Sequence, residues 1–130
     1  EASTQIIGNN RPILRFIGNK QINEGKTLTI QLEAFDFDNQ TLTFGTNAGS
    51  VLPSSFNFNK TTGLFIWTPT FTNSGIYNIT FNVTDSQPLY NVDSETLSIT
   101  VLDVKVSSGG SPFIFKKQKV PEVYPKEPIF

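Results

Sequence analysis

Hydrophobic and polar residues alternate through most of residues 27–104. In TLTIQLEA, residues 27–34, the side chains of Leu28, Ile30 and Leu32 fall on one side of an extended chain and the intervening polar side chains on the other. A β-strand points successive side chains to opposite faces, so this period of two predicts a strand with one buried face. No segment has the 3.6-residue period of a helix. The sequence therefore predicts an all-β domain.

Other segments extend this prediction along the chain. A first strand is expected at residues 12–18, and the alternation recurs at residues 41–44, 55–59, 64–67, 76–84 and 96–101. Turn-forming residues separate the segments: residues 23–25, 36–39, 47–50, 62–63, 73–75 and 86–88. Seven short strands in about 95 residues predict a seven-stranded antiparallel immunoglobulin-like β-sandwich, with a closed barrel as the alternative.

Aromatic residues supply the expected core. Phe65 and Trp67 occupy alternate positions of one predicted strand, and Pro69 ends that strand because proline cannot donate to a β-ladder. Tyr77 follows Gly75 at the start of the next strand, where sandwiches often place a corner tyrosine bonded to nearby backbone. A sugar-stacking platform is the alternative for these aromatics, and core packing is the interpretation we adopt.

The composition excludes several functions. The chain has 130 residues, no Cys, no His and a net charge of −1. Nucleophile systems that pair Ser or Cys with His are therefore impossible, and no disulfide can form. Neither a basic surface for nucleic acid nor an apolar run long enough to cross a membrane is present. Because the chain opens with Glu1 and lacks Met, we expect that a leader segment has been removed.

Composition also divides the chain into four parts. Residues 1–11 are an N-terminal extension, residues 12–106 the sandwich, residues 107–111 a Gly/Ser linker, and residues 112–130 an extended proline-rich segment. The last segment holds four lysines and two glutamates, a charge of +2. We expect it to dock on a neighbouring copy, adding a strand to its sheet, or else to fold back on its own domain. The expected assembly residues are Phe113, Phe115, Val120, Tyr124 and Phe130.

A family resemblance covers residues 10–104. The stretches NRPILRFIGNKQINEGKTLTIQLEAFDFDNQTLTF and FNFNKTTGLFIWTPTFTNSGIYNITFNVTD carry Asn-Glu-Gly, Thr-Gly, Trp-Thr-Pro and Gly-x-Tyr in order. In this they resemble the cadherin-like, dystroglycan-type and putative-Ig modules of surface proteins. The resemblance implies an extracellular or cell-surface setting and a role in adhesion or spacing. Where those modules have Gly-Asp-Ala after Asp-x-Asp, this chain has Asn39-Gln40-Thr41, one carboxylate fewer.

Four Asn-x-Thr triplets are candidate N-glycosylation sites. Their asparagines are Asn39, Asn59, Asn78 and Asn82. Because the residues on either side of Asn78 and Asn82 face the expected core, these two asparagines must face outward, roughly 14 Å apart. The alternative is that a chain rich in Asn and Thr contains such triplets by chance.

Acidic residues at one end of the predicted sandwich form a candidate calcium site. Topology places Asp36 and Asp38 with Asp85, and with Asp93 in the connection that follows. Glu24 and Asp103 belong to the opposite end. Calcium prefers six to eight oxygen ligands, which these aspartates and nearby carbonyls would supply, whereas aspartates that only shape turns are the alternative. We expect that the protein requires no cofactor, although it could bind calcium.

Two functions remain after these exclusions. The first is a non-catalytic extracellular structural module that assembles with its own copies, or with neighbouring surface modules, into a filament or lattice through residues 112–130. The alternative is a monomeric calcium-dependent or glycan-binding adhesion module of a larger surface protein. Paired carboxylates such as Asp36 and Asp38 could in principle serve glycoside hydrolysis, but nothing around them predicts a cleft. We expect no enzyme activity.

Overall fold

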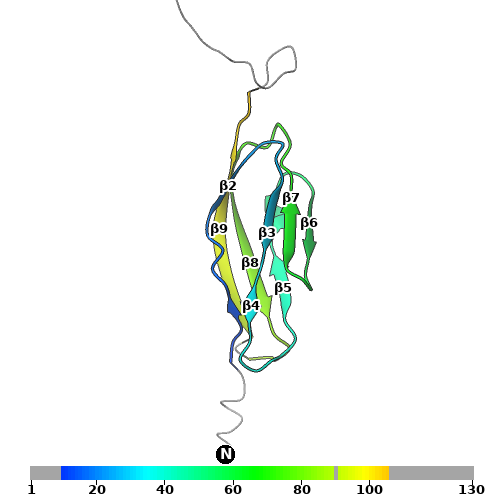
Figure 1. The fold of residues 1–130 in the computed structure, drawn as a ribbon, viewed down its shortest axis with the longest axis vertical. Helices are drawn as coiled ribbons and strands as arrows, with labels where there is room; N and C mark the ends of the chain where they lie inside the picture. The colour runs from blue at the N-terminus through cyan, green and yellow to red at the C-terminus, as the bar shows by residue number, and fades with distance from the viewer. Residues whose placement is uncertain (1–9, 90, 106–130) are drawn as a thin grey trace, which may run out of the picture.

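A computed structural model describes residues 10–89 and 91–105, and it confirms the immunoglobulin-like β-sandwich (Figure 1). One sheet has the order β2-β9-β8-β5, with strands at Lys20–Asn23, Val92–Leu102, Gly75–Thr84 and Thr43–Thr46. The other has the order β3-β7-β6, with strands at Leu28–Gln31, Leu64–Trp67 and Phe56–Asn59. Two short strands, β1 (Ile13–Leu14) and β4 (Ala34–Phe35), pair antiparallel with each other.

The core forms between the two sheets from the alternating residues. Phe65, Trp67 and Phe81 are almost fully buried, and the rings of Phe65 and Phe81 meet edge to face across the sheets at 5.3 Å. Side chains of this size each contribute roughly 1.5–3 kcal/mol when they leave water. The prediction that Phe65 and Trp67 point inward is confirmed, and so is the corner tyrosine, because the Tyr77 hydroxyl donates to the Asn73 carbonyl at 2.7 Å.

The first predicted strand differs from the expectation. Residues 12–18 do not form one strand: β1 ends at Leu14, the chain crosses to the other sheet, and β2 begins at Lys20 and runs parallel to β9. Side chains of β9 accept hydrogen bonds from the backbone of the segment between β1 and β2. Asp93 accepts the N–H of Leu14, while Glu95 accepts the N–H groups of Ile17 and Gly18, each at 2.8 Å. These bonds replace the ladder that the crossing segment lacks.

Smaller differences concern the other segments. The second predicted strand divides into β3 and β4, and the predicted strand at residues 41–44 lies two residues later, as β5. The turn expected at residues 47–50 contains a single helical turn, α2 (Ala48–Val51). The last strand begins four residues earlier than predicted, at Val92. The two ends of the described chain leave the elongated sandwich at opposite ends (Figure 1).

Candidate interaction surfaces

The four predicted calcium ligands lie at the end of the sandwich where the described chain begins. Asp36 follows β4, Asp85 follows β8, and Asp38 lies in the connection from β4 to β5 (Figure 1). Asp93 was expected in a connection, but it is the second residue of β9, because that strand starts earlier than the alternation indicated.

Each of these carboxylates contacts backbone N–H groups. Asp36 accepts from the N–H groups of Asp38 and Gln40 at 3.2 and 3.0 Å, and Asp85 accepts from that of Gln87 at 2.8 Å. Asp38 accepts from the N–H of Asn10 at 2.6 Å. The bonds to Asp36 and Asp85 are those with which aspartates shape turns. Asp38 and Asp93 instead connect segments far apart in the sequence, through Asn10 and Leu14.

Within the described part of the chain, no three acidic side chains are grouped as metal ligands would be. Calcium binding at Asp36, Asp38, Asp85 and Asp93 stays a prediction. Calorimetric titration with calcium, together with the melting temperature before and after addition of a chelator, would test it.

At the opposite end, Glu24 has a structural role that sequence reasoning did not find. Its side chain is buried and accepts the N–H groups of Ser74 and Val104 at 2.8 and 3.1 Å. Its own N–H donates to the Leu102 carbonyl. Glu24 therefore ties three chain segments together beside the point where β9 ends. The acid within the Asn-Glu-Gly turn was visible in the sequence, but its partners are 50 and 80 residues away.

The four glycosylation asparagines differ in their surroundings. Asn59 is exposed in the tight turn between β6 and β7, where its side-chain oxygen accepts the N–H of Thr61 at 2.9 Å. Asn39 is exposed and has a positive φ of 56°. Asn78 and Asn82 both point outward from β8, as expected, but only Asn78 is exposed, and Asn82 is half-buried beside Gly45. Glycosylation of these asparagines stays a prediction, and the structure favours Asn59 and Asn78.

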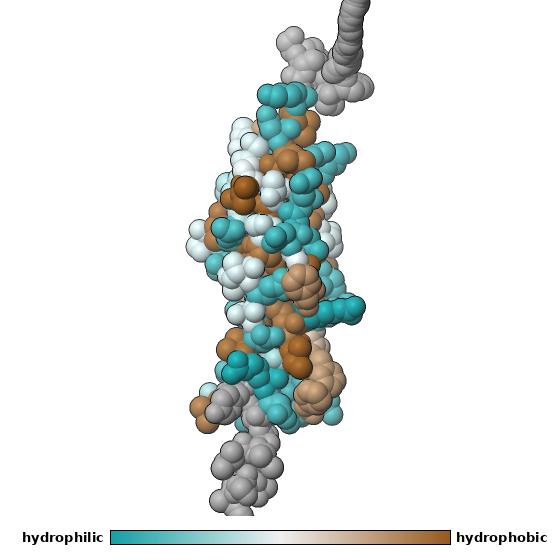
Figure 2. All heavy atoms as spheres, turned by 90° about the vertical axis from the view of Figure 1, so that its left-hand side faces the viewer, coloured by the Kyte–Doolittle hydropathy of each residue, from teal (hydrophilic) through white to brown (hydrophobic). Residues whose placement is uncertain are grey.

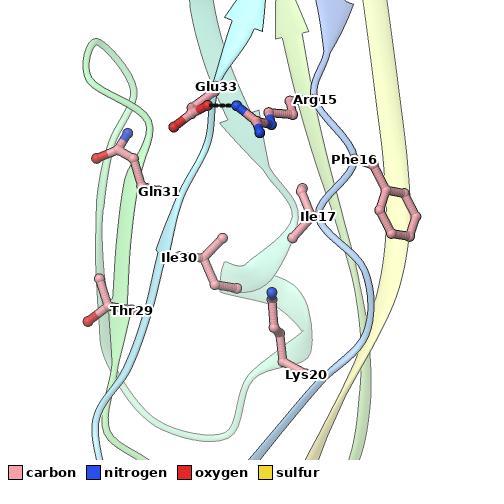
Figure 3. Close-up of a pocket in the computed structure, with 8 residues that line it drawn as sticks. All are labelled: Arg15, Phe16, Ile17, Lys20, Thr29, Ile30, Gln31 and Glu33. Carbon is pink, nitrogen blue, oxygen red and sulfur yellow. Dashed lines mark hydrogen bonds and ion pairs between the residues drawn. The ribbon is translucent and has the colours of Figure 1, made fainter.

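A cleft of about 280 Å³ lies between the β1–β2 crossing and β3 (Figure 3). Arg15 pairs with Glu33 at 2.8 Å at one end of this cleft, while Lys20 extends between Ile17 and Ile30 (Figure 3). Its lining residues are Arg15, Phe16, Ile17, Lys20, Thr29, Ile30, Gln31 and Glu33. The cleft exists because the chain crosses from β1 to β2. The sequence predicted one continuous strand at residues 12–18, and so it did not predict this cleft.

Polar and charged side chains make up most of the lining of this cleft. The charged side chains that line it are those of Arg15, Lys20 and Glu33, and the Glu33 carboxylate is already paired with Arg15. General acid–base or nucleophilic chemistry needs a group held within hydrogen-bond reach of a base or a reacting atom. No Ser or Tyr lies beside these groups in the lining, and the chain has no His or Cys.

An apolar patch, formed by Ile13, Phe35 and Phe37, lies at the same end of the sandwich as the four aspartates. These side chains are 50%, 55% and 64% exposed. Ile13 and Phe35 are register partners across β1 and β4, and the rings of Phe35 and Phe37 meet edge to face at 4.9 Å. Figure 2 shows hydrophobic side chains among hydrophilic ones toward this lower end of the molecule. Sequence reasoning did not select these residues, although Phe35 and Phe37 break the alternation of TLTIQLEA by placing large apolar groups on its polar side.

The predicted assembly residues Phe113, Phe115, Val120, Tyr124 and Phe130 lie outside the described residues. Among residues 10–89 and 91–105, the one helical segment is too short to cross a membrane.

The two packed sheets and the corner tyrosine, together with a first segment that pairs with β4 and then with β9, define an immunoglobulin-like module. The sequence model of the family described as "Putative Ig domain" matches residues 11–102, and the chain belongs to this family. No curated protein matches it.

Solved structures with the same fold include cadherin domains. Drosophila N-cadherin EC1-4 is similar with a TM-score of 0.60 at 19% identity, over 75% of this chain and 26% of that one. Human protocadherin-24 EC1-2 gives a TM-score of 0.54 at 20% identity, over 73% and 44% of the two chains. A nucleoside hydrolase-related hypothetical protein from Saccharophagus degradans, described as associated with carbohydrate metabolism, gives 0.56 at 14% identity, over 72% and 26%. This chain therefore spans less than half the length of each of these proteins.

Proposed function

We propose that this chain is a non-catalytic module of an extracellular surface protein, and that its copies join end to end through residues 112–130. The extracellular setting is supported by the cadherin neighbours, one of which is described as a set of extracellular cadherin domains. The non-catalytic role is supported by the absence of His and Cys from the whole chain and by the Glu33 carboxylate of the polar cleft being paired with Arg15.

The observation that carries the proposal is the position of the two chain ends. The described chain begins and ends at opposite ends of an elongated sandwich (Figure 1), so a segment that follows it starts far from the end where the chain enters. A contact between unlike ends of two copies is heterologous, and repeating it gives an open filament when the rotation does not close. The segment FIFKKQK, residues 113–119, is free of proline and has the apolar and basic residues that such a contact would use.

Size-exclusion chromatography with light scattering tests this function. We expect the full chain to form oligomers whose mass rises with concentration, and the chain without residues 112–130 to be monomeric. The buried hydrophobic core that the structure describes lies within residues 14–101, so this deletion removes none of it. A full-length variant, Phe113→Thr with Phe115→Thr, provides the same test without a truncation. If both altered chains assemble as the original does, the proposed function is wrong, and a monomeric full chain would favour the adhesion module instead.

A further inference from the structure

The apolar patch of Ile13, Phe35 and Phe37 has no covering element among the described residues. All three side chains are at least half exposed, and a shallow cavity of about 310 Å³ lies beside Ile13 and Phe35. Three side chains of this size expose roughly 300 Å² of apolar surface, which is the size of patch that marks interaction sites on soluble proteins. Arg15 and Glu33 also line this cavity, so charged residues border the patch.

Charge favours a basic partner for this patch. The register pair Thr80–Thr96 divides the sandwich into two halves. The half that holds the patch carries six acidic and three basic residues, a net charge of −3. They are Glu33, Asp36, Asp38, Asp85, Asp93 and Glu95, with Arg11, Arg15 and Lys60. The other half carries Glu24 and Asp103 with Lys20, Lys26 and Lys105, a charge of +1. Fields of this kind steer oppositely charged segments toward a surface.

The chain itself contains a segment with the matching chemistry. In residues 113–119, Phe113 and Phe115 precede Lys116, Lys117 and Lys119 without an intervening acid. Two aromatic side chains suit an apolar patch, and three lysines suit an acidic surround.

Chain length indicates which copy supplies this segment. The N–H of Leu14 donates to Asp93, so the patch lies level with the start of β9, and the nine residues from Asp93 to Leu102 rise about 31 Å. The described chain beyond β9 continues away from the sandwich in the same direction (Figure 1). The eight residues from Lys105 to Phe113 span at most about 29 Å when fully extended. Phe113 therefore cannot reach the patch of its own copy. In an end-to-end row, the patch of the next copy lies at the end that faces residues 113–119.

We infer that the apolar patch is the acceptor site for Phe113 and Phe115 of a second copy, with the following lysines against the acidic half of the sandwich. This inference rests on the proposed function and specifies its receiving surface. Each copy would then present an acceptor at one end and a donor at the other.

Matched full-length variants test the acceptor. Phe35→Thr with Phe37→Thr removes the patch, and Ile13→Lys supplies a second acceptor variant with a repelling charge. Phe71→Thr is the control, because Phe71 is 59% exposed and lies beside Gly25 at the other end of the sandwich. We expect both acceptor variants to keep the circular dichroism spectrum of the original chain and to weaken self-association at least tenfold. The control should associate as the original chain does.

Mixing distinguishes failure of this inference from failure of the proposed function. The acceptor variant keeps its donor segment, and the donor variant, Phe113→Thr with Phe115→Thr, keeps its patch. We expect each to be monomeric alone and the two to form a one-to-one dimer in light scattering. If the donor variant is monomeric but the acceptor variants still assemble, the acceptor lies elsewhere and the inference is wrong while the proposed function stands. If the donor variant still assembles but the chain without residues 112–130 does not, the inference is wrong and the proposed function stands. If both of these chains still assemble, both proposals are wrong.

Discussion

The side-chain network around Trp67 leads to a quantitative prediction about stability. The Trp67 indole N–H donates to the Ser54 hydroxyl at 2.9 Å, and that hydroxyl donates to the Asn73 side chain at 2.9 Å. The Asn73 side chain also accepts the N–H of Thr70, while the Asn73 carbonyl accepts from the Tyr77 hydroxyl. The rings of Trp67 and Tyr77 meet edge to face at 5.6 Å. Trp67 therefore connects the core to the loop that precedes β8.

The cost of Trp67→Ala can be estimated from this environment. Trp67 is 1% exposed, and truncating a buried aromatic residue to Ala typically costs about 3–5 kcal/mol. A domain of this size has a free energy of unfolding of roughly 5–14 kcal/mol, so the variant should fold with little stability left. Trp67→Phe keeps most of the apolar volume and loses the bond to Ser54, so we expect an intermediate cost of about 1–3 kcal/mol.

Urea unfolding followed by far-ultraviolet circular dichroism measures these changes without relying on tryptophan fluorescence. The matched control is Phe16→Ala, because Phe16 is 83% exposed and its truncation should change the free energy of unfolding by less than about 0.5 kcal/mol. Equal unfolding midpoints for Trp67→Ala and the original chain would refute the assignment of the inward face of β7. A midpoint for Trp67→Phe as low as that for Trp67→Ala would show that the hydrogen bonds outweigh the packing.

Three further predictions follow from local geometry. Gly63→Ala should lower the free energy of unfolding in urea by about 1–3 kcal/mol, because φ is +78° and a Cβ would lie 3.0 Å from Leu32 and Phe44. Gly49→Ala is the control and should leave the free energy of unfolding unchanged, because nothing lies within 4 Å of a Cβ there. Glu24→Gln should lower the melting temperature, because a buried carboxylate that accepts two N–H groups loses its charge and one acceptor. Mass spectrometry of native material should find glycans first on Asn59 and Asn78, and unmodified asparagines throughout would contradict this.

The sandwich was predictable because its strands obey a local rule. Phe65 and Trp67 face inward for the same reason that Leu64 and Ile66 do not: neighbouring side chains of a strand point to opposite faces. Pattern and turn residues therefore sufficed for the core strands and for Tyr77. The ends of strands were less predictable. Pairing with β8 extends β9 back to Val92, whereas the alternating pattern begins at residue 96.

The crossing of the first strand was not predictable from its own residues. The segment from Leu14 to Gly18 looks like a strand, and the groups that hold it away from a continuous ladder are the carboxylates of Asp93 and Glu95, nearly 80 residues later. The cleft beside Lys20 depends on that crossing and was missed with it. Glu24 is a similar case, since its role depends on backbone groups of Ser74 and Val104.

The candidate surfaces were predictable only in part. The positions of Asp36, Asp38 and Asp85 followed from strand order, because consecutive strands end at alternate ends of a sandwich. Phe35 and Phe37 were missed as exposed residues, although whether an apolar side chain on the polar side of a strand stays uncovered also depends on what the rest of the fold brings to it. A search for large apolar residues on the polar side of an alternating segment would have found both.

Electron microscopy of the assembled full chain tests the central claim most directly. If copies join end to end along the axis of β9, single rows should show an axial repeat of about 40–50 Å, which is the length of an 11-residue strand with its flanking loops. The rows should disappear when residues 112–130 are removed. Copies packed side by side with a shorter axial repeat, or rows that persist after the removal, would contradict the account.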